Sequence, residues 1–405
     1  MNMEYKKEPI KTKSKMKEIM TNYFLEAFDA KNKGKKVAWI TSGGPVEPLI
    51  AMDIIPIYPE NHGAMIGASK LGEKLVSYAE GLGYACDLCS YATADIACSR
   101  GEKGPIGHLP EPDMLICCNN ICSTVVKWYE IQARYFNVPL FILDTPMCHT
   151  NFTEDTKEYV RRQFDELFLF LETVCKKKMD FDRLEEVGRL SVQAQKLWQE
   201  ILDTTTHSPA PMSAFDAFFH LALIVTLRGT EICVNYYREL LEEMKDRIKN
   251  KICAVPNEKY RVLWDNLPIW YKTKWLSEKF AERDVCLVAD TYTSAWCSSL
   301  RYIDENDFLG SLAPAYARIY LNQGIDTMAN EIIKMIDKYK VHGIIMHSNR
   351  SCKPYSFGQY DIQKIVRDKT KVPVLIIEAD MLDQRSFSDA QIESRIDAFC
   401  ELLHS

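Results

Sequence analysis

Short runs of apolar, often β-branched residues alternate with segments of helical periodicity in the first third of the chain. Four of these runs predict buried strands, at Val37–Ser42, Ile54–Tyr58, Met114–Cys118 and Leu140–Asp144. Strands that are apolar throughout, rather than alternating with polar residues, are typical of a parallel sheet covered by helices on both faces. Residues 1–152 therefore predict an N-terminal α/β domain that includes a leading helix.

The middle of the chain changes to almost continuous helical periodicity, in TKEYVRRQFDELFLFLETVCKK and again in VNYYRELLEEMKDRIKNK. Residues 153–255 therefore predict a helical connector or cap. The alternation of strands and helices resumes in residues 256–405, with strands expected at Tyr260–Trp264, Cys286–Ala289, Gly343–His347 and Val374–Glu378. The predicted fold class is α/β, with two Rossmann-like or flavodoxin-like parallel-sheet domains joined by a helical segment.

The two α/β segments resemble each other in detail. DMLICCNNIC, a helix and NVPLFILDTP in the first correspond to HGIIMHSNRSC, a helix and KVPVLIIEAD in the second. In both copies a cysteine, Cys122 or Cys352, is expected just past the carboxyl end of a strand, where it opens the next helix. Ligands of open α/β sheets bind at that edge, and helix N-termini lower thiol pKa values. Both cysteines are therefore candidate ligands of one metal centre in the cleft between the domains.

The charge of the chain argues against one class of partner. The net charge is −6, and Lys and Arg are scattered among acidic residues, so nucleic acid is not an expected partner. The basic start of the chain is not followed by the apolar stretch of a secretion signal, and no stretch approaches the roughly 20 apolar residues that span a bilayer. We therefore expect a cytoplasmic protein that does not enter a membrane.

Fourteen cysteines are many for a chain of 405 residues. Cytosolic thiols stay reduced, so metal binding is a better explanation for some of them than disulfides. Cys86 and Cys89 have the C-x2-C spacing of thiolate sites, and this segment is expected to supply a third ligand. Zinc is the usual alternative, but a structural zinc site normally uses a second such pair, which the chain lacks. Six cysteines are interpreted as small buried hydrophobic residues: Cys175, Cys233, Cys253, Cys286, Cys297 and Cys400.

Four motifs carry a resemblance to a known family. They are YPENH at 58–62, CCNNIC at 117–122 with KWYE at 127–130, NRSCK at 349–353, and D-x-R-x-F-S-x-A-Q at 383–391. In this order they resemble segments of the larger subunit of the 2-hydroxyacyl-CoA dehydratase and benzoyl-CoA reductase family. The resemblance extends from about Lys17 to Leu403.

The resemblance implies a 4Fe-4S cluster that is held by three cysteines and keeps one iron open. The corresponding residues here are Cys89, Cys122 and Cys352, while Cys86, Cys117 and Cys118 are neighbours of the site. It also implies an acyl-CoA substrate, a related second subunit, and a separate ATP-hydrolysing iron–sulfur activator that delivers one electron. The chain has no G-x4-G-K-[ST] loop of its own, which agrees with ATP hydrolysis on another protein.

Two polar residues match positions that the family places near the open iron. Glu60 in YPENH and Ser42 in WITSGG are suited to moving a proton or holding a water molecule there. The alternative interpretations are a surface acid for Glu60 and a turn residue before two glycines for Ser42. His347, which precedes the second cysteine loop, is interpreted either as a strand-end histidine with satisfied hydrogen bonds or as a proton donor.

The resemblance leaves three functions open. The favoured one is a dehydratase that removes water from an (R)-2-hydroxyacyl-CoA through a ketyl radical and recycles its electron, as CNNIC, KWYE and SNRSC indicate. The segments EKYRVLWDNLPIW and ADTYTSAW are closer to benzoyl-CoA reductase subunits, which consume electrons. IEADMLDQR departs from the usual dehydratase pattern. A scaffold subunit that only carries a cluster is the third alternative, and it predicts a fully coordinated cluster.

Overall fold

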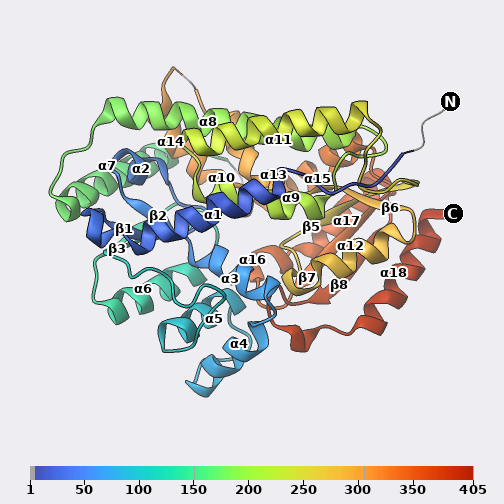
Figure 1. Cartoon of the computed structure of the whole chain (residues 1–405), viewed down its shortest axis with the longest axis horizontal. Coiled ribbons are helices and arrows are strands. Elements are labelled where there is room, and N and C mark those ends of the chain that lie inside the picture. Colours follow the sequence, from blue (N-terminus) through green and yellow to red (C-terminus); the bar gives the residue numbers. More distant parts are fainter. Residues whose placement is uncertain (1–4, 150, 305, 405) are drawn as a thin grey trace.

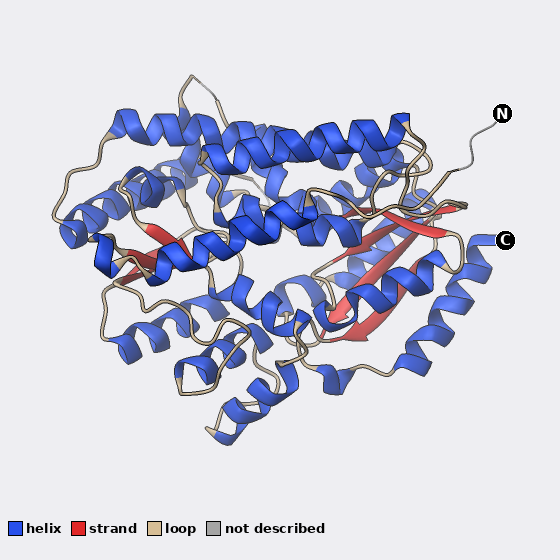
Figure 2. Cartoon of the chain, in the orientation of Figure 1, coloured by secondary structure: helices blue, strands red, loops and turns tan. Residues whose placement is uncertain are grey.

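Two four-stranded parallel sheets surrounded by helices form the protein in the computed structural model, which describes residues 5–149, 151–304 and 306–404 (Figure 1 and Figure 2). The first sheet has the order β2-β1-β3-β4 and consists of β1 (Val37–Ile40), β2 (Ile55–Ile57), β3 (Met114–Cys118) and β4 (Leu140–Leu143). The second has the equivalent order β6-β5-β7-β8 and consists of β5 (Tyr260–Asp265), β6 (Val285–Asp290), β7 (Gly343–Asn349) and β8 (Val374–Ala379).

Three groups of helices accompany the sheets. Those before and within the first sheet are α1 (Lys13–Phe28), α2 (Glu47–Ala51), α3 (Pro59–Ala68), α4 (Gly72–Gly81), α5 (Ser90–Ser99) and α6 (Thr124–Phe136). The middle helices are α7 (Glu154–Cys175), α8 (Phe181–Asp203), α9 (Ala214–His220), α10 (Ala222–Thr226) and α11 (Glu231–Lys249). Those of the last third are α12 (Thr273–Ala281), α13 (Thr291–Ser298), α14 (Phe308–Ala317), α15 (Ile325–Tyr339), α16 (Lys353–Ser356), α17 (Gln359–Thr370) and α18 (Asp389–His404).

The structure confirms the α/β class and the eight predicted strands, each within two residues of its expected ends. The helical middle is also confirmed, and each long helix begins at a side-chain cap, such as Thr153 before α7 and Asp180 before α8. The matching strand orders place β3 and β7 at the same position of their sheets, as the internal repeat predicts. The domain boundaries at 152/153 and 255/256 stay predictions.

Both faces of each sheet are covered, which explains why the strands are apolar throughout. On β3, Cys118 packs with the middle helices on one face, while Cys117 faces a second cluster on the other. That second cluster is continuous with one face of the second sheet, where it includes Leu263 and Ile344. The two sheets therefore share one hydrophobic cluster.

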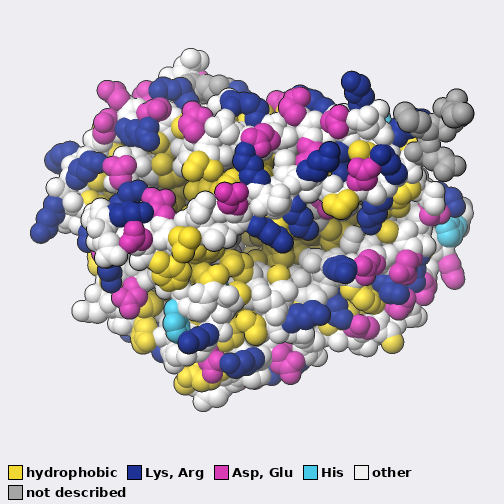
Figure 3. Space-filling view, in the orientation of Figure 1, with side chains coloured by type: hydrophobic (Ala, Val, Ile, Leu, Met, Phe, Trp, Pro, Cys, Tyr) yellow, Lys and Arg dark blue, Asp and Glu magenta, His cyan; other side chains and the backbone are white. Residues whose placement is uncertain are grey.

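The outer surface is mixed in charge. On the face that Figure 3 shows, Lys and Arg side chains are interspersed with Asp and Glu, and hydrophobic side chains gather toward the middle. Among the residues that the structure describes, no helix combines the length and the apolar character needed to cross a bilayer.

Candidate functional site

Cys122 and Cys352 occupy equivalent places, after the third strand in the order of each sheet. β3 ends four residues before Cys122, and β7 ends three residues before Cys352, which directly precedes α16. Backbone N–H groups at the start of the following helix favour the thiolate form of each cysteine and so act to lower its pKa, Val125 for Cys122 and Tyr355 for Cys352. The predicted position of both cysteines, at the carboxyl edge of a strand and the opening of a helix, is confirmed.

Cys89 reaches the same place from a different element. It is the residue immediately before α5, and the backbone N–H groups of Ala92 and Tyr91 act to lower the pKa of its thiol. Its sequence neighbour Cys86 is exposed and does not line the pocket that Cys89 lines. The C-x2-C spacing therefore does not mark a pair of ligands for one metal.

The three cysteines line one pocket, a cavity of about 190 Å³ that Ser42 and Glu60 also line. The charges of Cys122 and Cys352 contribute to raising the pKa of Cys89, which reflects how near the three sulfurs lie to one another. The structure thus brings together all five residues that the sequence marks as candidates, from segments spread over most of the chain.

The acidity of the cysteines differs from the expectation. Burial raises the pKa of the Cys122 thiol and raises the pKa of the Cys352 thiol to about 12, and the helix N–H groups offset only part of this effect. The prediction of lowered thiol pKa values is therefore wrong, because desolvation outweighs the helix N-terminus. A thiolate at this depth needs a metal cation in place of its proton.

The chemistry of these side chains suits an iron–sulfur cluster, which cysteine thiolates hold. Within residues 5–149, 151–304 and 306–404, no group of three or more His, Cys, Asp or Glu side chains is arranged to hold one metal ion. In an iron–sulfur cubane each cysteine binds a different iron. Three thiols around one largely apolar pocket suit that arrangement.

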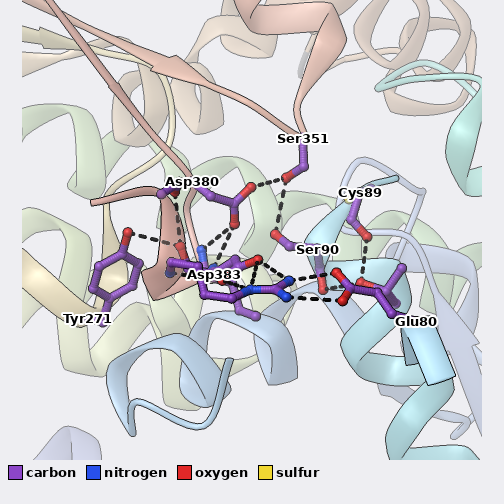
Figure 4. Close-up of polar contacts among 11 residues, drawn as sticks. Glu80, Cys89, Ser90, Tyr271, Ser351, Asp380 and Asp383 are labelled. Carbon is purple, nitrogen blue, oxygen red and sulfur yellow. Dashed lines mark hydrogen bonds and ion pairs between the residues drawn. The ribbon is translucent and has the colours of Figure 1, made fainter. Parts of the chain in front are cut away.

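A buried hydrogen-bond network connects the segments that carry Cys89 and Cys352 (Figure 4). Ser90 and Ser351, the neighbours of these cysteines, join their hydroxyl oxygens at 3.1 Å, and Ser351 donates to Asp380. Asp380 also accepts the backbone N–H groups of Leu382 and Asp383, each at 2.8 Å. Because these groups are buried, breaking the network leaves unpaired polar atoms, so it holds the two cysteines in a fixed relation.

Glu60 is a buried acid beside the cysteines. One carboxylate oxygen accepts the backbone N–H of Ser42 at 3.1 Å, and the other accepts the hydroxyl of Tyr129 at 3.4 Å. Burial raises the pKa of Glu60 to about 7, and the hydrogen bonds from Ser42 oppose this shift only in part. Glu60 is therefore not a surface acid. Ser42 does lie in a turn, and its backbone N–H donates to the carboxylate of Glu60.

His347 lies in β7 and does not line the pocket. It is fully buried, and its Nδ1 lies 2.6 Å from the carbonyl oxygen of Leu267, whereas its Nε2 is buried without a hydrogen-bond partner. Burial lowers its pKa to about 4, so it is neutral near pH 7. His347 is therefore a strand-end histidine whose hydrogen bonds are satisfied only in part, and the role of a proton donor stays a prediction.

Cys117 and Cys118 are buried in β3 and lie outside the pocket, as expected for neighbours of the site. We expect Cys117→Ala and Cys118→Ala to keep any bound iron and to lower the free energy of unfolding by about 1 kcal/mol, because each removes one buried sulfur. Iron analysis together with denaturant unfolding of the purified variants tests this. Iron loss from these variants, with Cys122→Ser unaffected, would show that the ligand lies earlier in the loop.

The sequence does not reveal a buried ion pair in the same pocket. Arg228 donates to Glu47 at 3.1 Å, although the two residues are 181 positions apart. Glu47 also accepts the hydroxyl of Ser191 at 2.6 Å and the hydroxyl of Tyr316. Burial alone would raise the pKa of Glu47, but Arg228 and these hydroxyls hold it below its usual value. No local pattern predicts such a pair, because neither partner has a motif around it.

Comparison with known proteins covers nearly the whole chain. The family described as "2-hydroxyglutaryl-CoA dehydratase, D-component" matches residues 41–403. The chain is 33% identical to the (R)-2-hydroxyisocaproyl-CoA dehydratase alpha subunit of Clostridioides difficile, over 95% of this chain and 94% of that one. It is 31% identical to the (R)-phenyllactyl-CoA dehydratase alpha subunit of Clostridium sporogenes, over 99% and 97%.

A third relative represents the other branch of the predicted family. The chain is 28% identical to a benzoyl-CoA reductase subunit of Thauera aromatica, over 100% of this chain and 97% of that one. The two dehydratase subunits named above match at higher identity, whereas the (R)-2-hydroxyglutaryl-CoA dehydratase alpha subunit of Acidaminococcus fermentans is 26% identical. With a family match over residues 41–403, the chain belongs to the 2-hydroxyglutaryl-CoA dehydratase D-component family.

Proposed function

We propose that this chain is the alpha-type subunit of an iron–sulfur (R)-2-hydroxyacyl-CoA dehydratase, a hydro-lyase. The observation that carries the proposal is the meeting of Cys89, Cys122 and Cys352 in one pocket with Glu60, in a chain that matches dehydratase subunits along almost its whole length. These three cysteines would hold a 4Fe-4S cluster. When bound, the cluster supplies an open iron with Lewis-acid character and a path for one electron.

The residues of the chain itself prepare the pocket for this chemistry. Its walls are mostly apolar, which disfavours water at the place where the thioester would lie. Glu60, with a pKa of about 7, keeps its proton in a large share of molecules at neutral pH and would give it to a leaving hydroxyl group. The backbone of Ser42 and the hydroxyl of Tyr129 fix the orientation of that carboxyl group.

The same proposal includes partners and architecture. The chain works with a related second subunit and receives an electron from an ATP-hydrolysing iron–sulfur activator, in the cytoplasm. Two α/β domains, residues 1–152 and 256–405, are joined by the helical segment 153–255, and the pocket lies in the cleft between them. The pocket's lining supports this, because Cys122 follows the first sheet and Cys352 follows the second.

Two other functions are weighed against this one. The 28% identity to a benzoyl-CoA reductase subunit supports an ATP-dependent reductase as the alternative. A scaffold subunit requires a fully coordinated cluster, whereas the described residues that line the pocket include three cysteines and no fourth. This donor set leaves one position of a cluster open, which favours a catalytic subunit.

Counting electrons separates the dehydratase from the reductase. The complex with its partner subunit is supplied with activator, ATP and a strong reductant, and electrons consumed are compared with product formed. We expect many molecules of 2-hydroxyacyl-CoA dehydrated per electron, because an elimination has no net redox change. Stoichiometric electron consumption with reduction of an aromatic acyl-CoA would contradict the dehydratase and establish the reductase.

A further inference from the structure

One side of the pocket is formed by hydrophobic side chains from α13, α14 and the segments that flank α14. This apolar wall consists of Trp296, Ile303, Phe308, Leu312, Ala315 and Ile319. Phe308, Leu312 and Ala315 follow one another at helical spacings of four and three residues, so they share one face of α14. Both helices pack against α8, and all three elements lie close together in Figure 1.

The apolar wall lies next to the cysteine loop. Asn120, two residues before Cys122, donates its side-chain amide to the carbonyl oxygens of Tyr316 at 2.8 Å and Gly43 at 2.9 Å. A Cβ placed on Gly43 would lie 2.6 Å from the Ile121 side chain and 3.4 Å from the Ile319 side chain. The end of α14 therefore touches both the cysteine loop and the turn that holds Glu60. A group that enters beside the cysteines meets the apolar wall directly.

The charges in the pocket are already paired. Arg228 is the one cation among the described residues that line it, and its guanidinium donates to Glu47 at 3.1 Å, to Tyr316 at 3.0 Å and to a backbone carbonyl. It also lies 5.7 Å from the ring of Trp296. The carboxylate of Glu47 in turn accepts hydrogen bonds from Arg228, Ser191 and Tyr316. A second anion placed here would find no free cation and would face the carboxylate of Glu47.

Two further polar side chains that line the pocket have partners within the protein, whereas the hydroxyl of Tyr320, which also lines it, is buried without a hydrogen-bond partner. Ser299 donates to Gln195 at 2.7 Å, and Ser311 donates to the carbonyl oxygen of Asp307 at 2.7 Å. The cavity of about 190 Å³ is shared with the three cysteines, so its volume alone does not set the size of the acyl group. The polarity of the wall suits a branched aliphatic or aromatic group.

Resting on the proposed function, we propose that the apolar wall is the binding site for the side chain of the acyl group. The site selects acyl-CoA thioesters with a branched aliphatic or aromatic side chain and rejects those whose acyl group ends in a free carboxylate. Rejection follows because a buried carboxylate without a free cation is strongly disfavoured. Glu47 is the specificity-determining residue, since it neutralises the cation that would otherwise receive such a carboxylate.

Binding is measured by calorimetry with isocaproyl-CoA and glutaryl-CoA, which lack the 2-hydroxyl group and are not dehydrated, on the assembled complex without activator. We expect isocaproyl-CoA to bind at least about 10²-fold more tightly, the scale on which pockets discriminate against a group they cannot pair. In Glu47→Gln, Arg228 keeps its charge but has no counter-ion. The ratio of the dissociation constants of the two ligands should therefore change by about tenfold or more in favour of glutaryl-CoA. Equal or tighter binding of glutaryl-CoA to the wild-type complex overturns the inference.

A second pair of variants keeps the inference testable if Glu47→Gln does not fold. Leu312→Phe fills part of the cavity from α14, whereas Leu309→Phe makes the same change on the same helix at a position that does not line the pocket. Leu312→Phe should lower kcat/KM for 2-hydroxyisocaproyl-CoA relative to the smaller lactoyl-CoA by about tenfold, and Leu309→Phe should leave that ratio unchanged. Equal ratios in both variants contradict the assigned site. Failure to dehydrate any 2-hydroxyacyl-CoA, with the binding preference intact, contradicts the proposed function alone.

Discussion

Cys89→Ser, Cys122→Ser and Cys352→Ser are each expected to lose the iron–sulfur cluster and with it all measurable dehydration. Each thiol lines the pocket of about 190 Å³, and a serine hydroxyl ionises far less readily than a thiol, so it cannot replace a thiolate ligand. The complex is purified without oxygen, and iron content, electron paramagnetic resonance and turnover are measured for each variant.

Cys86→Ser is the matched control for these three variants. Cys86 lies three residues before Cys89 in the same loop but is exposed and outside the pocket, so its replacement should leave iron content and turnover unchanged. Normal cluster content in any of the three pocket variants would remove that cysteine from the ligand set. Iron loss in Cys86→Ser would add this residue to the set.

Glu60→Gln should keep the cluster but lower turnover by about 10²-fold or more, the contribution of a positioned acid. The substitution preserves the shape of the side chain and its ability to accept the N–H of Ser42, while it removes the proton that Glu60 gives up. Iron analysis and single-turnover rates on the variant separate this loss from a loss of cluster. Glu73→Gln, an exposed position on α4, is the matched control and should turn over like the wild type.

The pH dependence of turnover gives a second test of Glu60. Burial raises its pKa to about 7, so Glu60 is protonated below that pH and becomes a carboxylate above it. If its protonated form donates to the leaving hydroxyl group, kcat/KM should fall as the pH rises through about 7. This decline should disappear in Glu60→Gln. A wild-type rate that rises across the same interval would assign Glu60 the opposite role, that of a base.

The elements of the fold and the repeated cysteine loop follow from local patterns in the amino-acid sequence. The eight strands could be predicted because a strand buried on both faces is a local run of apolar residues, and the helices because their periodicity is visible within a few turns. The similarity of the two segments placed Cys122 and Cys352 after equivalent strands, since the backbone repeats the same strand–loop–helix path. The proposal of Cys89, Glu60 and Ser42 came from motif resemblance, not from periodicity.

Long-range packing of the folded chain sets which of these residues meet and how their surroundings change their chemistry. Ser90 and Ser351 are 261 positions apart and Glu47 and Arg228 are 181 apart, so no local pattern links either pair. Burial likewise depends on everything that packs around a group, which is why the thiol pKa values rise at helix N-termini where the sequence predicts a decrease. The polarity of the pocket also depends on the whole fold. Desolvation and charge pairing depend on all the groups around a side chain, and these groups come together only when the chain is folded.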